Sequence, residues 1–174
     1  MNKRLILFSL LYVAFTIVAI CISFYGGYIK QLNLIYFLTL LFFLPFVFIY
    51  LLQIRNKENG GVISGRVAME QALKMVMLST LLLTIFQVVF FELDFKEYKI
   101  NHIKSIGPEI IKQEITKGQL KAKIEDIPKI LENDIKQVTI FAEVTATLFK
   151  NIFYGLFCSF ISAMIIKRKS FSSI

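Results

Sequence analysis

Four long apolar runs constrain the fold of this chain more than any other feature. They are Leu5–Ile29, Gln31–Ile54, Met75–Phe91 and Val144–Ile166, and Lys150 is the only charged residue inside them. A helix needs about 20 apolar residues to cross the hydrocarbon layer of a bilayer. Helices satisfy their own backbone hydrogen bonds in lipid, and these runs lack the period-two alternation of barrel strands. The sequence therefore predicts an all-α integral membrane protein with four transmembrane helices.

The length of the chain leaves room for one membrane domain. Its 174 residues are 56% hydrophobic, which is too apolar for a domain that folds in water. We expect a single four-helix membrane domain over residues 1–174. Its spans are expected at about 5–25, 34–53, 72–91 and 146–166, and a helical insertion, about 92–141, separates the third span from the fourth.

The distribution of charge predicts the orientation of the spans. The net charge is +8, but the segment between Glu92 and Phe141 holds nine lysines and nine acidic residues and is neutral overall. The positive excess lies on the other side of the spans, at Lys3, Arg4, Arg55, Lys57, Arg66, Lys167, Arg168 and Lys169. Basic residues in short loops stay in the cytoplasm, so both termini are expected there and residues 92–141 outside. This pattern indicates the lipid bilayer as the partner and argues against nucleic acid.

The exterior segment predicts two helices. Gly107-Pro108 indicates a break, residues 109–117 have a helical pattern, and Gly118 is a suitable C-terminal stop. Asp126 then suits an N-cap, with Pro128 just inside a second helix.

That second helix is amphipathic and is expected to continue into the fourth span. Its apolar face consists of Ile127, Ile130, Leu131, Ile135 and Val138. We interpret it as an interaction helix. The candidates for covering this face are the short helix before it, a neighbouring protomer, the bilayer surface and another protein.

Small and polar residues predict a packing seam between the third and fourth spans. They recur on one face of each helix, at Thr80, Thr84 and Gln87, and at Asn151, Gly155, Ser159 and Ala163. Small residues let membrane helices approach closely, and polar ones hydrogen-bond across the contact. Counting depth from the outer surface places Gln87 near Asn151, Thr84 near Gly155 and Thr80 near Ser159. A path for a polar solute along the seam is the alternative interpretation.

Two pairs of charged residues lie at helical spacing near the membrane surfaces. Glu70 and Lys74 are four residues apart, so they can form an ion pair in the first turns of the third helix. Glu143 and Lys150 are seven apart at the outer interface and are the best acid–base pair in the chain. Alternatively, both side chains extend to the lipid headgroups.

The sequence predicts no catalytic, cofactor or metal site. His102 is the sole histidine, and Cys21 and Cys158 both lie in expected spans. A zinc site needs clustered ligands, and nucleophilic catalysis needs a base beside the nucleophile. This pattern favours a protein that is not an enzyme.

Several short motifs resemble a known family. They are Gly60, Gly61, Ile63 and Ser64 before the third span, Ala72, Leu73 and Lys74 at its start, and Ser162, Ala163, Lys167, Arg168 and Lys169 at the end. With the order of the spans, they resemble a four-pass membrane family of Bacteroidota, the domain-of-unknown-function 4199 family. The resemblance implies a bacterial inner-membrane protein whose periplasmic segment precedes its last helix. It also implies a role in the envelope, because relatives are sometimes encoded beside a glycosyltransferase similar to polyprenyl-phosphate sugar synthases.

Two functional hypotheses follow. The first is a non-enzymatic accessory, scaffold or regulatory subunit in envelope biogenesis, bound to a glycosyltransferase-like membrane protein. The alternative is a subunit of an oligomeric transporter of small solutes or lipids, in which the homo-oligomer encloses the path.

Overall fold

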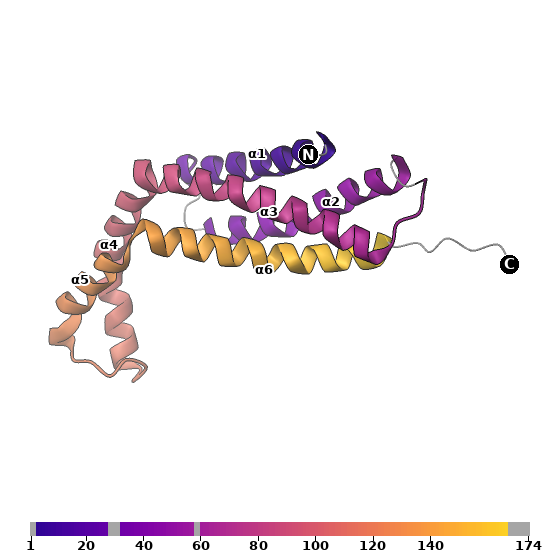
Figure 1. Cartoon of the computed structure of the whole chain (residues 1–174). Helices are drawn as coiled ribbons and strands as arrows, with labels where there is room; N and C mark the ends of the chain where they lie inside the picture. The colour runs from indigo at the N-terminus through magenta and orange to yellow at the C-terminus, as the bar shows by residue number, and fades with distance from the viewer. Residues whose placement is uncertain (1–2, 28–31, 58–59, 167–174) are drawn as a thin grey trace. The chain divides into compact units, whose positions relative to one another are not determined.

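The computed structural model describes residues 3–27, 32–57 and 60–166, and every regular element among them is a helix (Figure 1). The elements are α1 (Lys3–Tyr25), α2 (Leu32–Lys57), α3 (Gly65–Phe90), the π-helix η2 (Phe91–Phe95), α4 (Lys96–Thr116), the 3₁₀-helix η3 (Ile124–Asp126), α5 (Ile127–Gln137) and α6 (Ile140–Ile166). Four stretches are long and apolar enough to cross a membrane: α1, Phe37–Lys57 of α2, the continuous helix that begins as α3, and α6. The predicted all-helical class is confirmed. The expected basic cluster Lys167, Arg168, Lys169 lies outside the described residues.

The chain forms two compact units. One contains α1, α2, α3 up to Thr84, and α6 from Leu148, and we call it the bundle. The other covers Ile85–Thr147 and includes α4 and α5, and we call it the hairpin unit.

The bundle has one hydrophobic core to which all four of its helices contribute. Val47, Tyr50 and Leu51 of α2 are fully buried, as are Ala72 and Met75 of α3. The core is completed by Leu5, Phe8, Tyr12 and Val13 of α1 and by Cys158, Ala163 and Ile166 of α6. Leu5, Phe8 and Tyr12, like Ala72 and Met75, lie three or four residues apart, which is the spacing of one helix face.

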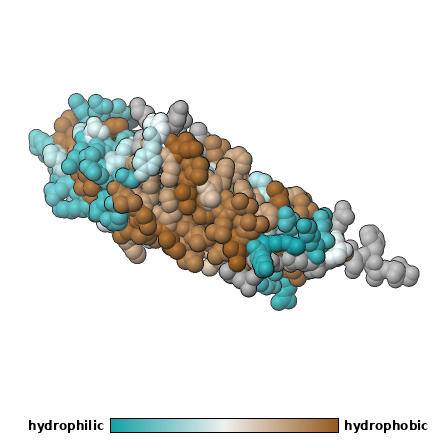
Figure 2. Space-filling model, turned by 90° about the horizontal axis from the view of Figure 1, so that it is seen from above, coloured by the Kyte–Doolittle hydropathy of each residue, from teal (hydrophilic) through white to brown (hydrophobic). Residues whose placement is uncertain are grey.

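The outer surface of the bundle is also apolar. Leu41 of α2, Met77 and Leu81 of α3, and Phe153 and Phe157 of α6 are more than half exposed. Figure 2 shows a brown apolar band along the bundle and hydrophilic residues at the end where α2 ends and α3 begins. An apolar surface of this extent is favourable against lipid and unfavourable against water.

The turn before α3 contains two glycines in a left-handed backbone conformation. Gly60 and Gly61 have positive φ angles of 57° and 86°, which glycine adopts without steric cost. Ser64 then caps α3, because its Oγ accepts a hydrogen bond from the backbone N–H of Val67 at 3.3 Å.

The helix that begins at Gly65 continues through η2 into α4 and ends at Thr116, 52 residues in all. The break expected at Gly107-Pro108 is therefore wrong, since both residues lie inside α4. Proline removes one backbone hydrogen bond from a helix. Here the neighbouring turn is held by packing, because Ile111 is buried and α4 lies against α5.

The end of α4 confirms the predicted stop at Gly118. This residue has a φ of 69°, and its N–H donates to the carbonyl of Ile115 at 3.0 Å. The N–H of Gln119 donates to the carbonyl of Glu114 at 2.9 Å. These two bonds form a Schellman motif, which satisfies carbonyl groups that a helix end leaves unpaired.

The predicted continuity between the amphipathic helix and the fourth span is wrong. Val138 leaves the helical conformation at φ −73° and ψ 78°, so α5 ends at Gln137. Thr139 then begins α6: its Oγ1 accepts from the N–H of Ala142 at 3.3 Å, and its carbonyl from the N–H of Glu143 at 3.2 Å. A threonine in this position caps a new helix and competes with continuation of the old one.

Candidate functional site

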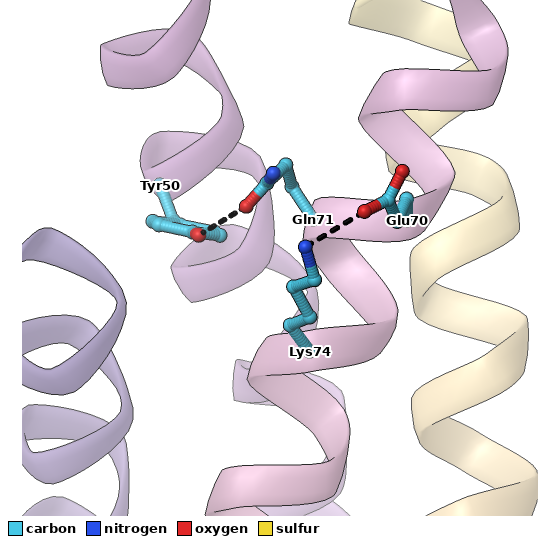
Figure 3. Close-up of polar contacts among 4 residues, drawn as sticks. All are labelled: Tyr50, Glu70, Gln71 and Lys74. Atoms are coloured by element: carbon cyan, nitrogen blue, oxygen red, sulfur yellow. Dashed lines mark hydrogen bonds and ion pairs between the residues drawn. The ribbon is translucent and has the colours of Figure 1, made fainter. Parts of the chain in front are cut away.

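Polar side chains connect α2 and α3 at the end of the bundle where α3 begins. The hydroxyl group of the fully buried Tyr50 donates to Oε1 of Gln71 at 3.1 Å (Figure 3). One turn along α3, Lys74 Nζ lies 2.7 Å from Glu70 Oε1, and both side chains are about half exposed. The ion pair expected between Glu70 and Lys74 is therefore present in the first turns of α3.

The small and polar residues of the expected seam lie mostly inside the protein. Thr80, Gln87, Gly155, Ser159 and Ala163 are buried. Asn151 and Thr84 are half-buried, and the hydroxyl group of Thr84 donates to the carbonyl of Thr80 at 2.8 Å.

The register expected for the seam differs from the structure. Gly155 lies against Val76, where a Cβ atom at position 155 would be 2.5 Å from Val76 Cγ1. Asn151 lies beside Ser79 and Thr80, around a common cavity. The sequence had placed Gly155 at Thr84, two helical turns further along α3. The close contact of Gly155 with Val76 fixes the register of α6 against α3. Counting residues from the helix ends does not reveal this contact.

The cavity is the second polar feature of the bundle. It is lined by Tyr12 of α1, Phe43 of α2, Ser79, Thr80 and Leu83 of α3, and Asn151 of α6. Tyr12 was not singled out by the sequence, because its hydroxyl group is one polar atom on an otherwise apolar helix face. The hydroxyl group donates to the backbone carbonyl of Thr39 at 3.4 Å.

The hairpin unit is built on the contact between α4 and α5. A Cβ atom at Gly107 would lie 2.5 Å from Leu131 Cδ2, so glycine at this position allows α5 to approach α4 closely. The apolar side chains of the interaction helix are half-buried, namely Ile127, Ile130, Leu131, Ile135 and Val138. Of the four candidates for covering this face, the short helix before it is therefore the one in contact with α5, and it forms the end of α4.

An ion pair joins α4 to the first turns of α6 in the hairpin unit. Lys99 Nζ donates to Glu143 Oε1, and Glu143 is only 19% exposed. The ammonium group of Lys99 also lies over the Phe95 ring, 5.2 Å from its centroid. The expected partner of Glu143 was Lys150, which is exposed. Lys99 was missed because sequence spacing reveals pairs only within one helix.

A row of stacked rings follows the helix from α3 into α4. The rings are those of Phe86, Phe90, Phe95, Tyr98 and His102, and neighbouring centroids lie 5.4, 5.4, 6.1 and 5.8 Å apart. The extra residue of the π turn places Phe95 over Phe90, where an uninterrupted α-helix would place Asp94. His102, the lone histidine, is exposed at the end of this row. Within the described residues, no group of three or more His, Cys, Asp or Glu side chains is placed to hold a metal ion.

Four long apolar helices with an apolar outer surface define a multi-pass membrane protein. The model of the family described as "Protein of unknown function (DUF4199)" matches residues 6–168, and the chain belongs to this family. The family expected from the short motifs is thereby confirmed. No curated protein and no solved structure matches the chain.

Proposed function

We propose that this protein is a non-enzymatic accessory subunit that anchors or regulates a membrane partner in envelope biogenesis, with the hairpin unit as its docking element. The observation that carries the proposal is that α4 and α5 form a compact unit of their own, separate from the apolar bundle. The protein lies in a bacterial inner membrane with both termini in the cytoplasm and residues 92–141 in the periplasm. The neutral balance of charges in that segment and the basic residues elsewhere support this orientation.

The docking surface is assigned to the outer side of α4. The apolar face of α5 is already in contact with α4, so its residues hold the hairpin together. Ile106 and Ile110 are 36% and 48% exposed and lie four residues apart on one face of α4. Exposed charged residues flank them at Lys104, Glu109 and Lys112. An apolar centre with a polar rim is the usual arrangement of a protein–protein interface.

The partner is an integral membrane protein with a polar surface outside the membrane, and the family resemblance favours a glycosyltransferase-like protein. The docking unit is exterior and neutral overall, so a partner that binds it need not be strongly charged. Interfaces of this kind depend on a few central apolar residues.

Affinity purification of the tagged full-length protein from its native membrane tests this function. We expect a stoichiometric partner to co-elute with the unmodified protein and to be lost from the double variant Ile106→Glu/Ile110→Glu. The matched control is Asn101→Glu/Ser105→Glu, which adds the same two charges four residues apart at exposed positions of α4. The control should retain the partner. If the Ile106→Glu/Ile110→Glu variant retains the partner, or if both variants lose it equally, this surface does not bind the partner.

The second candidate function is a subunit of an oligomeric transporter of small solutes or lipids. It is favoured by the buried polar side chains of the bundle, which include Ser9, Thr39, Ser79, Thr80, Ser159 and Ser162. A purified homo-oligomer without a partner, together with solute or lipid flux in proteoliposomes that Thr80→Val reduces, would favour this function over the first.

A further inference from the structure

The cavity, a pocket that is partly open to the surface of the bundle, has room for one water molecule. The volume open to the centre of a water molecule is about 10 Å³, close to the minimum that one bound water requires. Four of its six lining side chains carry polar atoms: Tyr12, Ser79, Thr80 and Asn151. They come from three different helices of the bundle.

Ser79 supplies the independent observation. It is 1% exposed, and its Oγ makes no hydrogen bond to any described protein group. A buried hydroxyl group without a partner is unfavourable, because it has lost its hydrogen bonds to water. In most membrane helices such a group donates to a carbonyl of its own helix, as Thr84 does to Thr80. Ser79 Oγ makes no such bond, as is also true of Ser9, Thr16, Ser159 and Ser162, and of these five residues only Ser79 lines the cavity.

We propose that the cavity binds a single water molecule, hydrogen-bonded by Ser79 of α3 and Asn151 of α6. The amide group of Asn151 has both donors and an acceptor, and a serine hydroxyl group can donate and accept. The hydroxyl groups of Thr80 and Tyr12 complete the two to four polar partners that a buried water usually has. The water would connect α3 to α6. This site is independent of the proposed docking function.

Radiolytic hydroxyl-radical labelling of the purified full-length protein tests the proposal, because radicals formed from a bound water modify the side chains beside it. We expect Tyr12 and Phe43, which line the cavity, to be modified at least fivefold faster than Tyr50. Tyr50 is the matched control, since it is fully buried and does not line the cavity. Modification of Tyr12 and Phe43 at or below the rate of Tyr50 would show that the cavity is dry and overturn the proposal.

Two serine variants test whether the hydroxyl group of Ser79 binds the water. Ser79→Ala removes the hydroxyl group at the cavity and should lower the modification of Tyr12 and Phe43 severalfold. Ser159→Ala is the control, because Ser159 is also fully buried without a protein partner but does not line the cavity. It should leave both rates unchanged. Unchanged rates in Ser79→Ala would contradict the role of this serine. The comparison of Tyr12 with Tyr50 in the unmodified protein tests the water site even if a variant does not fold.

Discussion

Individual small residues determine how closely the helices of the bundle approach. Gly155 of α6 leaves space that Val76 of α3 fills, and the side chain of Val76 is 2% exposed. In lipid, helix association depends on packing and on polar contacts, because apolar surface gains little by leaving lipid. The loss of one such fit therefore has a large effect on a membrane bundle.

We predict that Gly155→Ala destabilises the bundle by about 1–3 kcal/mol, the usual range for an overpacked core. The new Cβ atom would lie 2.5 Å from Cγ1 and 2.9 Å from Cγ2 of Val76, so the helices must move apart. The thermal unfolding temperature of the detergent-solubilised protein measures this effect. Val76→Ala in the same chain should restore part of the lost stability. If the double variant loses as much as the two single changes together, the residues do not interact.

The sequence predicted which residues are buried more accurately than it predicted which residues contact one another across helices. Buried side chains at positions such as Thr80, Ser159 and Ala163 follow from helical spacing. The contact between Gly155 and Val76 does not, because antiparallel helices can slide in steps of one turn without changing the buried face. Tyr12 and Ser79 meet Asn151 only through the packing of several helices, so no local pattern predicts the cavity.

At the scale of elements, helix ends were predictable where a single residue determines the backbone. Gly118 ends α4 as expected. Predictions failed where two local signals compete. Gly107-Pro108 favours a break, yet the packing of α4 against α5 keeps the helix intact. Between α5 and α6, helical spacing favours continuity, yet Thr139 caps a new helix.

We predict that Gly118→Ala loosens the connection between α4 and α5. A residue with a side chain at a φ of 69° costs about 1–2 kcal/mol, because its Cβ atom crowds the backbone. Hydrogen exchange of the backbone amides at positions 118 and 119 should therefore be several times faster in this variant than in the unmodified protein. Lys117→Ala is the control, since Lys117 has an ordinary helical φ of −78° and should tolerate alanine. Equal exchange in the two variants would mean that the Schellman motif contributes no local stability.

For the whole molecule, the apolar outer surface of the bundle is the property that the sequence predicted most directly. Long apolar runs with a single charged residue indicated the four helices. The structure adds that apolar side chains both form the core and line the outer surface of the bundle. The separation of the hairpin unit was not predictable in the same way. It depends on contacts between α4 and α5, and a pattern along one helix does not identify its partner.

We predict that residues 57 and 105 lie on opposite sides of the membrane, as the proposed orientation requires. Each would be replaced by cysteine, as Lys57→Cys or Ser105→Cys, in a chain whose Cys21 and Cys158 are changed to alanine. Both positions are exposed. A membrane-impermeant maleimide should label position 105 in intact spheroplasts and position 57 only after lysis. The reverse pattern would invert the orientation, and labelling of both in intact spheroplasts would exclude an odd number of spans between them.

The contribution of α6 to the bundle core has a consequence for biosynthesis. Cys158, Ala163 and Ile166 join a core whose other members all lie between Leu5 and Leu83, so the ribosome delivers the first three helices well before the fourth. Until then, Val76 has no Gly155 to pack on. A nascent chain that stops after α5 would present an unfilled helix face to the translocon and to membrane proteases. During synthesis the first three helices of the bundle therefore remain without part of their core until α6 is inserted.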